Sequence, residues 1–315
     1  MPDIVVTFFA LGVIAGLARS DLQVPKATYD TLSILLMLTI GLKGGLALHG
    51  QLSLALVPEL LAAALLGGVI PLVCYPLLRR IVKLDNANSA SIAAHYGSVS
   101  AGTFAVVLAY LESRGITYSP QATLYLVLME LPAIVVAIIL YRRLSGATGN
   151  VGHLVHEALT GRGVILLAGG VIIGYLYGAE RAETVAPLFM TAFKGLLALF
   201  LLEMGLCTAK CMQPFPWGQW RLIVFALCMP FALAFAGAAM GHLMGLPAGS
   251  VLVLATLAAS ASYIAAPAAI RGAIPEADIG LAMFVSLGIT FTLNVTLGIP
   301  FYHRLVDWMG GAGLF

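Results

Sequence analysis

The chain has 315 residues, of which 61% are hydrophobic and only 10% are charged, and its mean hydropathy is +1.01. Soluble domains carry about 25% charged residues, so this composition excludes an ordinary soluble globular protein and predicts an all-α polytopic membrane protein in contact with lipid. The formal net charge of +2 gives no sign of a nucleic-acid partner. The four cysteines lie in or beside apolar segments, which favours neither a disulfide framework nor a metal site.

Ten apolar segments follow one another along the chain, and each is near the roughly 20 residues that cross a bilayer. The first and the sixth are short. The first segment has no basic region before it, so we interpret it as a membrane span rather than a cleavable signal peptide. The predicted spans are residues 4–18, 29–48, 53–78, 89–111, 121–141, 163–178, 187–209, 219–245, 249–270 and 279–302.

The two halves of the chain resemble each other. Residues 35–42 match residues 199–206 at an offset of 164, and the same offset places Glu130 opposite Asn294. Five spans per half is an odd number, so the second half is predicted to insert upside down, as in transporters built from inverted repeats. We expect a first repeat over residues 1–145, a linker over 146–162 and a second repeat over 163–315.

The distribution of positive residues predicts the orientation in the membrane. Eleven of the sixteen Lys and Arg residues fall on the side that holds the linker, and five fall on the side that holds the two termini. Positive residues concentrate on the cytoplasmic side of membrane proteins. We therefore expect a cytoplasmic linker and outward-facing termini, in a bacterial inner membrane.

Two of the ten segments are interrupted by residues that weaken helices, at matching places in the two halves. The first interruption lies within residues 97–103 and the second within residues 258–267. An unwound backbone in the membrane is tolerated where it lines a cavity or is buried in protein. We therefore predict two helices broken at mid-membrane, which is the best sequence indication of a transporter site. The hydroxyl residues that align at an offset of 162 are Ser98 and Ser100 with Ser260 and Ser262.

These breaks offer what a small anion needs. Each half-helix that starts after a break presents free amide groups and the positive end of its dipole, and the hydroxyl groups add donors. The same hydroxyls and freed carbonyls can coordinate sodium. Tyr263 either shapes the cavity, donates its hydroxyl or packs between helices. The alternative for all these residues is close helix packing by small side chains. The candidate substrate residues are Ser98, Ser100, Gly102, Thr103, Ser260, Ser262 and Tyr263.

A carboxylate inside a membrane span is a candidate functional group by default. Glu130 lies in mid-span beside Pro132 and is expected to neutralise a cation or carry a proton, or else to be a buried carboxyl hydrogen-bonded across helices. Asn294 and Ser262 complete the candidate ion-coupling set. Glu203, also in mid-span, is expected to pair with a lysine, either Lys43 or Lys194, or to lie at an interface.

The motifs of common enzyme classes are missing from the sequence. It contains no HExxH zinc motif, no phosphate-binding Walker loop and no nucleophile elbow. We therefore expect neither an enzyme nor a cofactor, and any transport must run on ion gradients or on the gradient of the substrate itself.

Five stretches taken together resemble the sodium-dependent bicarbonate transporter (SbtA-type) family. The resemblance covers nearly the whole chain, and each stretch alone is a weak signal. The stretches are Leu38–Gly45, Gly97–Thr103, Leu124–Ala133, Ala258–Ser262 and Arg271–Pro275.

This resemblance implies a core domain from spans 3–5 and 8–10 and a gate domain from spans 1–2 and 6–7, with the broken helices crossing at mid-membrane. It also implies bicarbonate at the crossing, a coupled sodium ion, a homotrimer and inhibition by a PII-like protein from the cytoplasm. The short linker of this chain argues against that regulator. The substrate residues that the resemblance implies are Ser98, Val99, Ser100, Gly102, Thr103, Ser260 and Ser262.

The chain departs from the family pattern at the second break, where Tyr263 stands in place of an aspartate and Ala265 in place of a serine. The main hypothesis is a secondary transporter that imports a small monovalent anion, with bicarbonate and sodium as the leading pair, by an elevator-like alternating-access mechanism. The alternatives are a proton- or sodium-coupled transporter of another small carboxylate or anion, and a membrane sensor that keeps the fold without transport.

Overall fold

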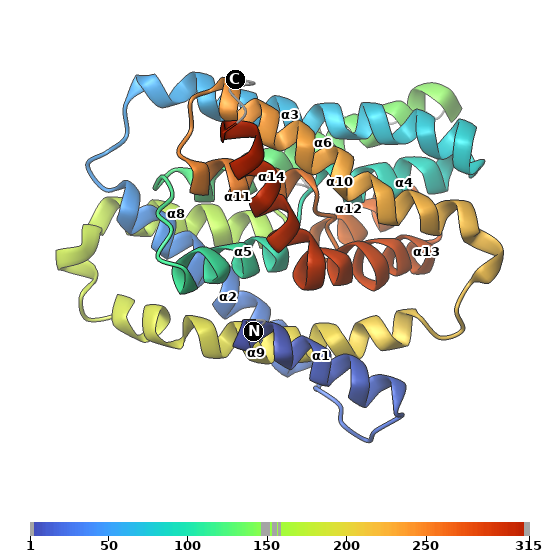
Figure 1. Cartoon of the computed structure of the whole chain (residues 1–315), viewed down its shortest axis with the longest axis horizontal. Helices are drawn as coiled ribbons and strands as arrows, with labels where there is room; N and C mark the ends of the chain where they lie inside the picture. Colours follow the sequence, from blue (N-terminus) through green and yellow to red (C-terminus); the bar gives the residue numbers. More distant parts are fainter. Residues whose placement is uncertain (1–2, 146–151, 153–155, 157–158, 312–315) are drawn as a thin grey trace.

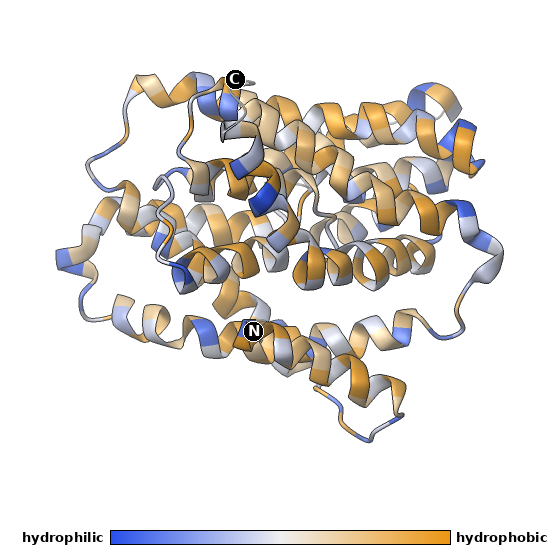
Figure 2. Cartoon of the chain, in the orientation of Figure 1, coloured by the Kyte–Doolittle hydropathy of each residue, from blue (hydrophilic) through white to orange (hydrophobic). Residues whose placement is uncertain are grey.

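The computed structural model describes residues 3–145, 152, 156 and 159–311, so most of the predicted linker 146–162 lies outside the described residues. All regular secondary structure in these described parts is helical. Most of the long helices run along one common direction (Figure 1). Apolar residues cover the helices over much of their length, and hydrophilic residues gather at helix ends and in the connections (Figure 2). This pattern is that of an integral membrane protein.

Eight helical segments of the described chain are long and apolar enough to cross a membrane. The first and ninth predicted spans correspond to shorter apolar helices, α1 (Ile4–Leu17) and α11 (Ala248–Ala258). The sixth predicted span corresponds to α8 (Arg162–Ala182), which is interrupted by a kink at Gly178 (φ 64°, ψ 177°), so the regular helix before the kink is short, as predicted. The eight candidate spans are Lys26–Leu48, Leu54–Val82, Asn86–Ser113, Ala122–Ser145, Arg162–Ala182, Ala186–Cys211, Trp217–Leu243 and Ile279–Gly311.

Four helices form a group that we call the flanking group: α1, α2 (Lys26–Leu48), α8 and α9 (Ala186–Cys211). In it α1 packs along α9 and α2 along α8, and α1 and α9 lie along the lower edge of Figure 1. Both contacts depend on glycine. A Cβ at Gly12 of α1 would meet the Leu202 carbonyl, and one at Gly45 of α2 would meet the Val171 carbonyl. Small residues therefore let these backbones approach closely.

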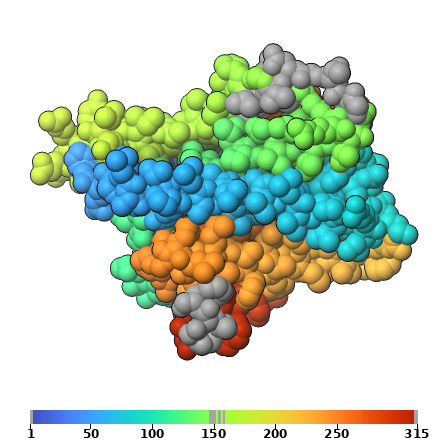
Figure 3. Space-filling model, turned by 90° about the horizontal axis from the view of Figure 1, so that it is seen from above, coloured from blue at the N-terminus to red at the C-terminus, as the bar shows by residue number. Residues whose placement is uncertain are grey.

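The other helices form the central group. Within it α3 packs on α4 and α6, and α10 packs on α11 and α14. Seen from above, α3 lies between α6 and α10 (Figure 3). The helices of this group not yet given bounds are α3 (Val57–Leu77), α4 (Asn86–Gly97), α5 (Ala101–Ser113), α6 (Ala122–Ser145), α10 (Trp220–Leu243), α12 (Ala265–Ala273), α13 (Ile279–Met283) and α14 (Ile299–Gly311).

Short 3₁₀ and π-helical segments extend several of these helices. Two π-helical segments lie between α13 and α14, where the sequence pattern predicts one regular span, and such segments are often found at functional sites. The segments are the 3₁₀ turns Leu54–Leu56 and Trp217–Gln219 and the π-helical stretches Leu78–Val82, Phe284–Phe291 and Asn294–Gly298.

Both predicted helix breaks are present. The first separates α4 from α5, and the second separates α11 from α12. The segment that contains the first break is the most deeply buried of the eight candidate spans. The unwound backbone is therefore enclosed by protein rather than exposed to lipid, as the missing helical hydrogen bonds require.

Candidate functional site

The first break consists of three residues between the end of α4 and the start of α5. Val99 has a φ of 47°, in the left-handed region that β-branched residues rarely adopt. Such strained backbone persists where the surroundings enforce it, often at functional sites. Ser100 then caps α5, because its Oγ accepts a hydrogen bond from the Thr103 amide at 3.1 Å. The strained turn and the cap together aim the N-terminus of α5 into the protein interior.

The second break is longer and has a similar cap. Helix α11 ends at Ala258, and α12 starts at Ala265. The Ser262 Oγ accepts a hydrogen bond from the Ala266 amide at 3.2 Å, so it satisfies one amide in the first turn of α12. The Ser260 hydroxyl instead donates to the Leu257 carbonyl at 2.8 Å, at the end of α11. The two aligned serines of this break therefore have different structural roles.

Two hydrogen bonds join the breaks directly. The Ser100 amide donates to the Ser260 Oγ at 2.9 Å, and the Ser262 amide donates to the His95 carbonyl at 2.7 Å. All four residues are buried. The two breaks, which are about 160 residues apart in sequence, thus form one continuous polar unit in the interior.

A small cavity lies where the breaks meet the flanking group. It has an accessible volume of about 10 Å³, which is near the minimum that one water molecule needs. Met37 of α2 and Leu167 of α8 close it on the side of the flanking group. The residues that line this cavity are Met37, Val99, Ser100, Ala101, Glu130, Leu167, Ser262, Tyr263, Ile264 and Ala265.

A larger cavity of about 380 Å³, which we call the vestibule, adjoins the small one. The two cavities share Glu130, Ile264 and Ala265 in their walls. Residues 160–163, where the predicted linker 146–162 ends and α8 begins, line the vestibule as well. The breaks are therefore approached from the end of the molecule that holds the linker.

The opposite end of the molecule differs. A cavity of about 660 Å³ lies between α1 and α5 and is lined by Arg114 and Lys194, but it shares no residue with the small cavity. At the same end, Lys43 of α2 forms an ion pair with Glu112 of α5. The breaks therefore have an approach from the linker end, whereas the opposite cavity stops short of them.

Several predicted substrate residues carry polar groups that have no hydrogen-bond partner among the described residues. They are the hydroxyls of Ser98, Thr103 and Tyr263, all of them buried. The Tyr263 hydroxyl lies near Ser100 but not in hydrogen-bonding geometry, and a Cβ at Gly102 would collide with it. Buried polar groups are nearly always paired. Of these three residues Tyr263 lines the small cavity, so its hydroxyl is available to a bound ion or to water, whereas Ser98 and Thr103 line neither cavity beside the breaks.

Other predicted residues are already engaged. Asn294 donates from Nδ2 to the Ala259 carbonyl at 2.9 Å and accepts from the Tyr302 hydroxyl at 2.7 Å. It does not line either of the cavities beside the breaks. Asn294 and Ser260 therefore support the second break, and an ion-coupling role for Asn294 stays a prediction.

The two intramembrane glutamates have different surroundings. Glu130 lines both cavities beside the breaks, and its carboxylate forms neither a hydrogen bond nor an ion pair with any of the described residues. The Glu203 carboxylate accepts a hydrogen bond from the Cys207 thiol at 3.2 Å. The hypothesis that Glu203 pairs with Lys43 is wrong, because Lys43 pairs with Glu112.

Sequence reasoning missed the residues that the flanking group contributes. Met37 and Leu167 are ordinary apolar residues of ordinary spans, so no local signal distinguishes them. Arg162 lines the vestibule, whereas the sequence predicts for it only a place among the positive charges near the membrane. Its position at the start of an apolar span, directly after a glycine, is the one available signal.

The family comparison agrees with this architecture. The model of the Na+-dependent bicarbonate transporter superfamily matches residues 4–307, which is nearly the whole chain and includes both breaks. No curated protein matches the chain.

Proposed function

Because the chain belongs to the Na+-dependent bicarbonate transporter superfamily, we propose that it imports bicarbonate together with sodium through the site formed by the two helix breaks. Membership makes the chain an integral membrane transporter, not an enzyme, with sodium and bicarbonate as the ions that its family moves. The observation that carries the proposal is the pair of hydrogen bonds between the breaks, Ser100 to Ser260 and Ser262 to His95, beside a cavity lined by the unpaired hydroxyl of Tyr263.

In this proposal the anion lies at the N-terminus of α5, where the helix dipole and free amides favour negative charge. Its ligands are the hydroxyls of Ser98, Ser100, Thr103, Ser262 and Tyr263 and the amides of Val99, Ala101 and Gly102, because the Ser100 amide is bonded to Ser260. The small cavity holds about one water, so binding a larger anion requires the side chains there to move. Ser260 keeps the breaks together.

The coupled sodium ion is proposed to interact with Glu130, with Ser262 as a further oxygen ligand and Asn294 as a support. Glu130 suits this role because its unpaired carboxylate faces the cavities. A cation beside it would supply the missing countercharge, which an intramembrane carboxylate needs. No other cofactor is proposed.

The transport cycle is proposed to be elevator-like, with two inverted repeats of five spans and with the broken helices crossing at mid-membrane. The contacts support it, because α1 and α2 of the first half pack on α9 and α8 of the second. The flanking group would be the gate domain and the central group the core domain. Access from the linker end corresponds to an inward-facing state if that end is cytoplasmic.

The wider arrangement is also a proposal. We place the chain in a bacterial inner membrane with its termini outside and the linker inside, as a homo-oligomer in contact with lipid, on the family pattern a trimer. A PII-like regulator is the least supported part, since the linker is short.

A second candidate function is supported by Tyr263, a neutral residue where the family pattern is acidic. Of the lining residues that the structure describes, Glu130 is the only acidic one in the two cavities beside the breaks. Coupling through Glu130 to a proton, with another small carboxylate as substrate, is compatible with this set. A non-transporting sensor is the third candidate.

Uptake of radiolabelled bicarbonate into proteoliposomes tests these candidates. We expect accumulation when sodium is high outside, and none when potassium replaces it. Accumulation driven only by a proton gradient, or of formate and acetate but not bicarbonate, would support the second candidate. Thermal stabilisation by bicarbonate without any flux would support the sensor.

A further inference from the structure

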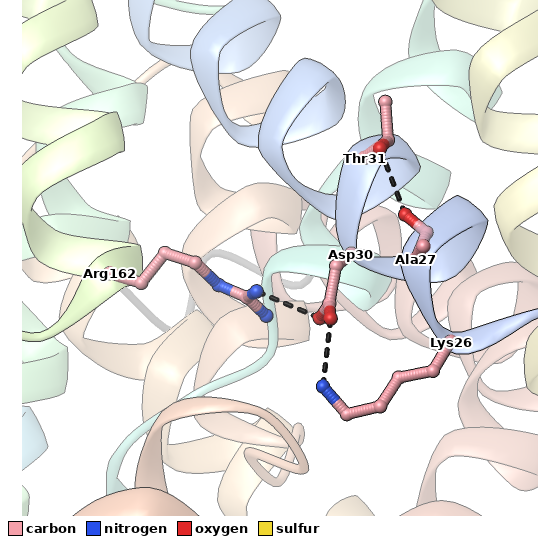
Figure 4. Close-up of polar contacts among 5 residues, drawn as sticks. All are labelled: Lys26, Ala27, Asp30, Thr31 and Arg162. Carbon is pink, nitrogen blue, oxygen red and sulfur yellow. Dashed lines mark hydrogen bonds and ion pairs between the residues drawn. The ribbon is translucent and has the colours of Figure 1, made fainter.

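The mouth of the vestibule carries an arginine that is held by an ion pair. Arg162, the first residue of α8, lines the vestibule, and its Nη1 lies 2.8 Å from the Asp30 Oδ1 of α2. The other oxygen of Asp30 is 2.8 Å from the Lys26 Nζ. Figure 4 shows Asp30 between the two cations. Asp30 thus binds one nitrogen of the guanidinium group, and the other N–H donors of this group have no acceptor among the described residues.

Two helix N-termini face the same vestibule. Helix α8 follows Gly161, which has no side chain to cap it, and residues 160–163 line the cavity. Helix α12 starts at Ala265, and Ala265, Ala268 and Ala269 line the cavity as well. The first amides of a helix have no partner within it, and its dipole is positive at that end. Both helix starts therefore add positive potential to that of Arg162.

Few negative groups of the described residues lie near the vestibule. Among the described residues that line it the single carboxylate is Glu130, at the inner end next to the small cavity. Asp30 is matched by two cations, Lys26 and Arg162. The mouth therefore favours an anion, while the deeper part beside Glu130 suits a cation.

We propose that Arg162 forms an anion-binding station at the mouth of the vestibule, with Asp30 as the positioning residue that aims its guanidinium group. The station suits small planar oxyanions of the carboxylate class, bicarbonate included, because the fork of N–H donors matches two oxygens. It rests on the proposed function, in that the substrate passes this mouth on its way between the breaks and the cytoplasm.

The electrostatic part can be tested without transport. Ala268 is an exposed residue in the vestibule wall, and Ala268→Cys reports the local potential through its rates of reaction with two methanethiosulfonate reagents, one carrying a sulfonate and one a trimethylammonium group. The unsubstituted chain gives the background. We expect Arg162→Gln to lower the ratio of the anionic to the cationic rate by about two- to fivefold. Arg162→Lys, which keeps the positive charge, should leave most of this ratio intact.

Arg80→Gln is the matched control, because Arg80 is an exposed arginine that lines none of the cavities described above. It should leave the ratio unchanged. If the ratio of the anionic to the cationic rate at Ala268→Cys is the same with Arg162→Gln as with Arg162 intact, the proposed anion-binding station is refuted.

The binding part is tested by sided transport. In inside-out vesicles Arg162→Gln should raise the KM for bicarbonate at the cytoplasmic face several-fold, with little change of KM in right-side-out vesicles. Arg162→Lys, which keeps the charge but lacks the fork, should raise it partly. A change of equal size at both faces would place Arg162 elsewhere in the cycle and contradict the station.

Asp30→Asn separates positioning from charge. Removing this negative charge should raise the ratio of anionic to cationic reaction rates at position 268. Because the Arg162 guanidinium group is then no longer held in position, the KM for bicarbonate at the cytoplasmic face should rise. A lower KM would refute the positioning role. If the unsubstituted protein moves no bicarbonate from either side, the proposed function fails, and the reagent ratio still decides whether the station exists.

Discussion

Lys43 of α2 and Glu112 of α5 form an ion pair that joins the flanking group to the central group at the end of the molecule away from the linker. Both side chains are about one-quarter exposed, at 28% and 29%. The Lys43 ammonium also lies 5.2 Å from the centre of the Phe193 ring on α9. If the two groups move past each other during transport, this pair has to separate.

Glu112→Gln should therefore favour the state that is open at the termini end. A partly exposed pair contributes about 0.5–1 kcal/mol, so the population ratio should shift by about two- to fivefold. The measurement is the rate at which an impermeant thiol reagent, added outside, labels Ala101→Cys in the small cavity. Lys26→Gln, which removes a charge from a pair within the flanking group, is the control. A labelling rate equal to that of the control would exclude a latch role.

Ser100 is predicted to affect both binding and stability. The sequence alone predicts little change in stability for Ser100→Ala, because the site faces a cavity. However, the Ser100 Oγ caps α5, and loss of a cap costs about 0.5–2 kcal/mol. We now expect Ser100→Ala to lower the melting temperature and to weaken bicarbonate binding about tenfold, since a hydrogen bond to a charged group is worth about 1.5–3 kcal/mol.

Thr103→Val separates these two effects. The Thr103 hydroxyl has no partner among the described residues, so its removal should not reduce stability, but it should weaken binding if the hydroxyl contacts the anion. Thr296→Val, at an exposed threonine that lines neither of the two cavities beside the breaks, should change neither. Normal binding by both Ser100→Ala and Thr103→Val would move the site away from the first break.

Ser260 is expected to be structural. Its Oγ accepts from the Ser100 amide at 2.9 Å in a fully buried place, and a buried donor left without an acceptor costs about 1–3 kcal/mol. Ser260→Ala should therefore destabilise the protein in thermal unfolding in detergent. The control is Thr256→Val in the preceding helix α11, because the buried hydroxyl of Thr256 is unpaired in the described structure. Equal stability of the two variants would contradict the bridge between the breaks.

Glu130 gives the test of ion coupling. If its carboxylate neutralises a bound cation, Glu130→Gln should raise the sodium concentration for half-maximal uptake by about tenfold or more, since one charged hydrogen bond is worth about 1.5–3 kcal/mol. The fold should remain, because the carboxylate holds no described partner. Sodium-dependent uptake measured against the unsubstituted protein decides this. Unchanged ion dependence would make Glu130 a structural residue.

The breaks were predictable because their cause is local. Glycine and hydroxyl residues weaken a helix wherever they cluster, so the runs around Ser98 and Ser260 identify both interruptions. Their partners were not predictable, because the bond from the Ser100 amide to Ser260 depends on how distant segments pack. The same limit applies to Asn294. Its match to Glu130 in the sequence suggests a shared role, but its side chain is hydrogen-bonded to the Ala259 carbonyl and the Tyr302 hydroxyl.

The sharpest test of the site concerns Gly102 and Tyr263. A Cβ at Gly102 would collide first with the Tyr263 hydroxyl oxygen, while the next atoms, Phe200 Cε1 and Tyr263 Cζ, are 3.1 and 3.2 Å away. Gly102→Ala should therefore impair both stability and transport by overpacking, which costs about 1–3 kcal/mol. Tyr263→Phe removes the one oxygen that collides, and the Tyr263 ring remains packed edge-on against Phe291 with centres 5.1 Å apart.

Adding Tyr263→Phe to Gly102→Ala should thus restore much of the lost thermal stability, and the double variant should be more stable than the sum of the single effects predicts. Transport should not recover to the same degree if the Tyr263 hydroxyl binds the anion, because the rescue removes that ligand. Tyr263→Phe alone then shows normal melting with a raised KM for bicarbonate. Normal melting with an unchanged KM would leave Tyr263 as a packing residue, and failure of the double variant to regain stability would contradict the contact between Tyr263 and Gly102 itself.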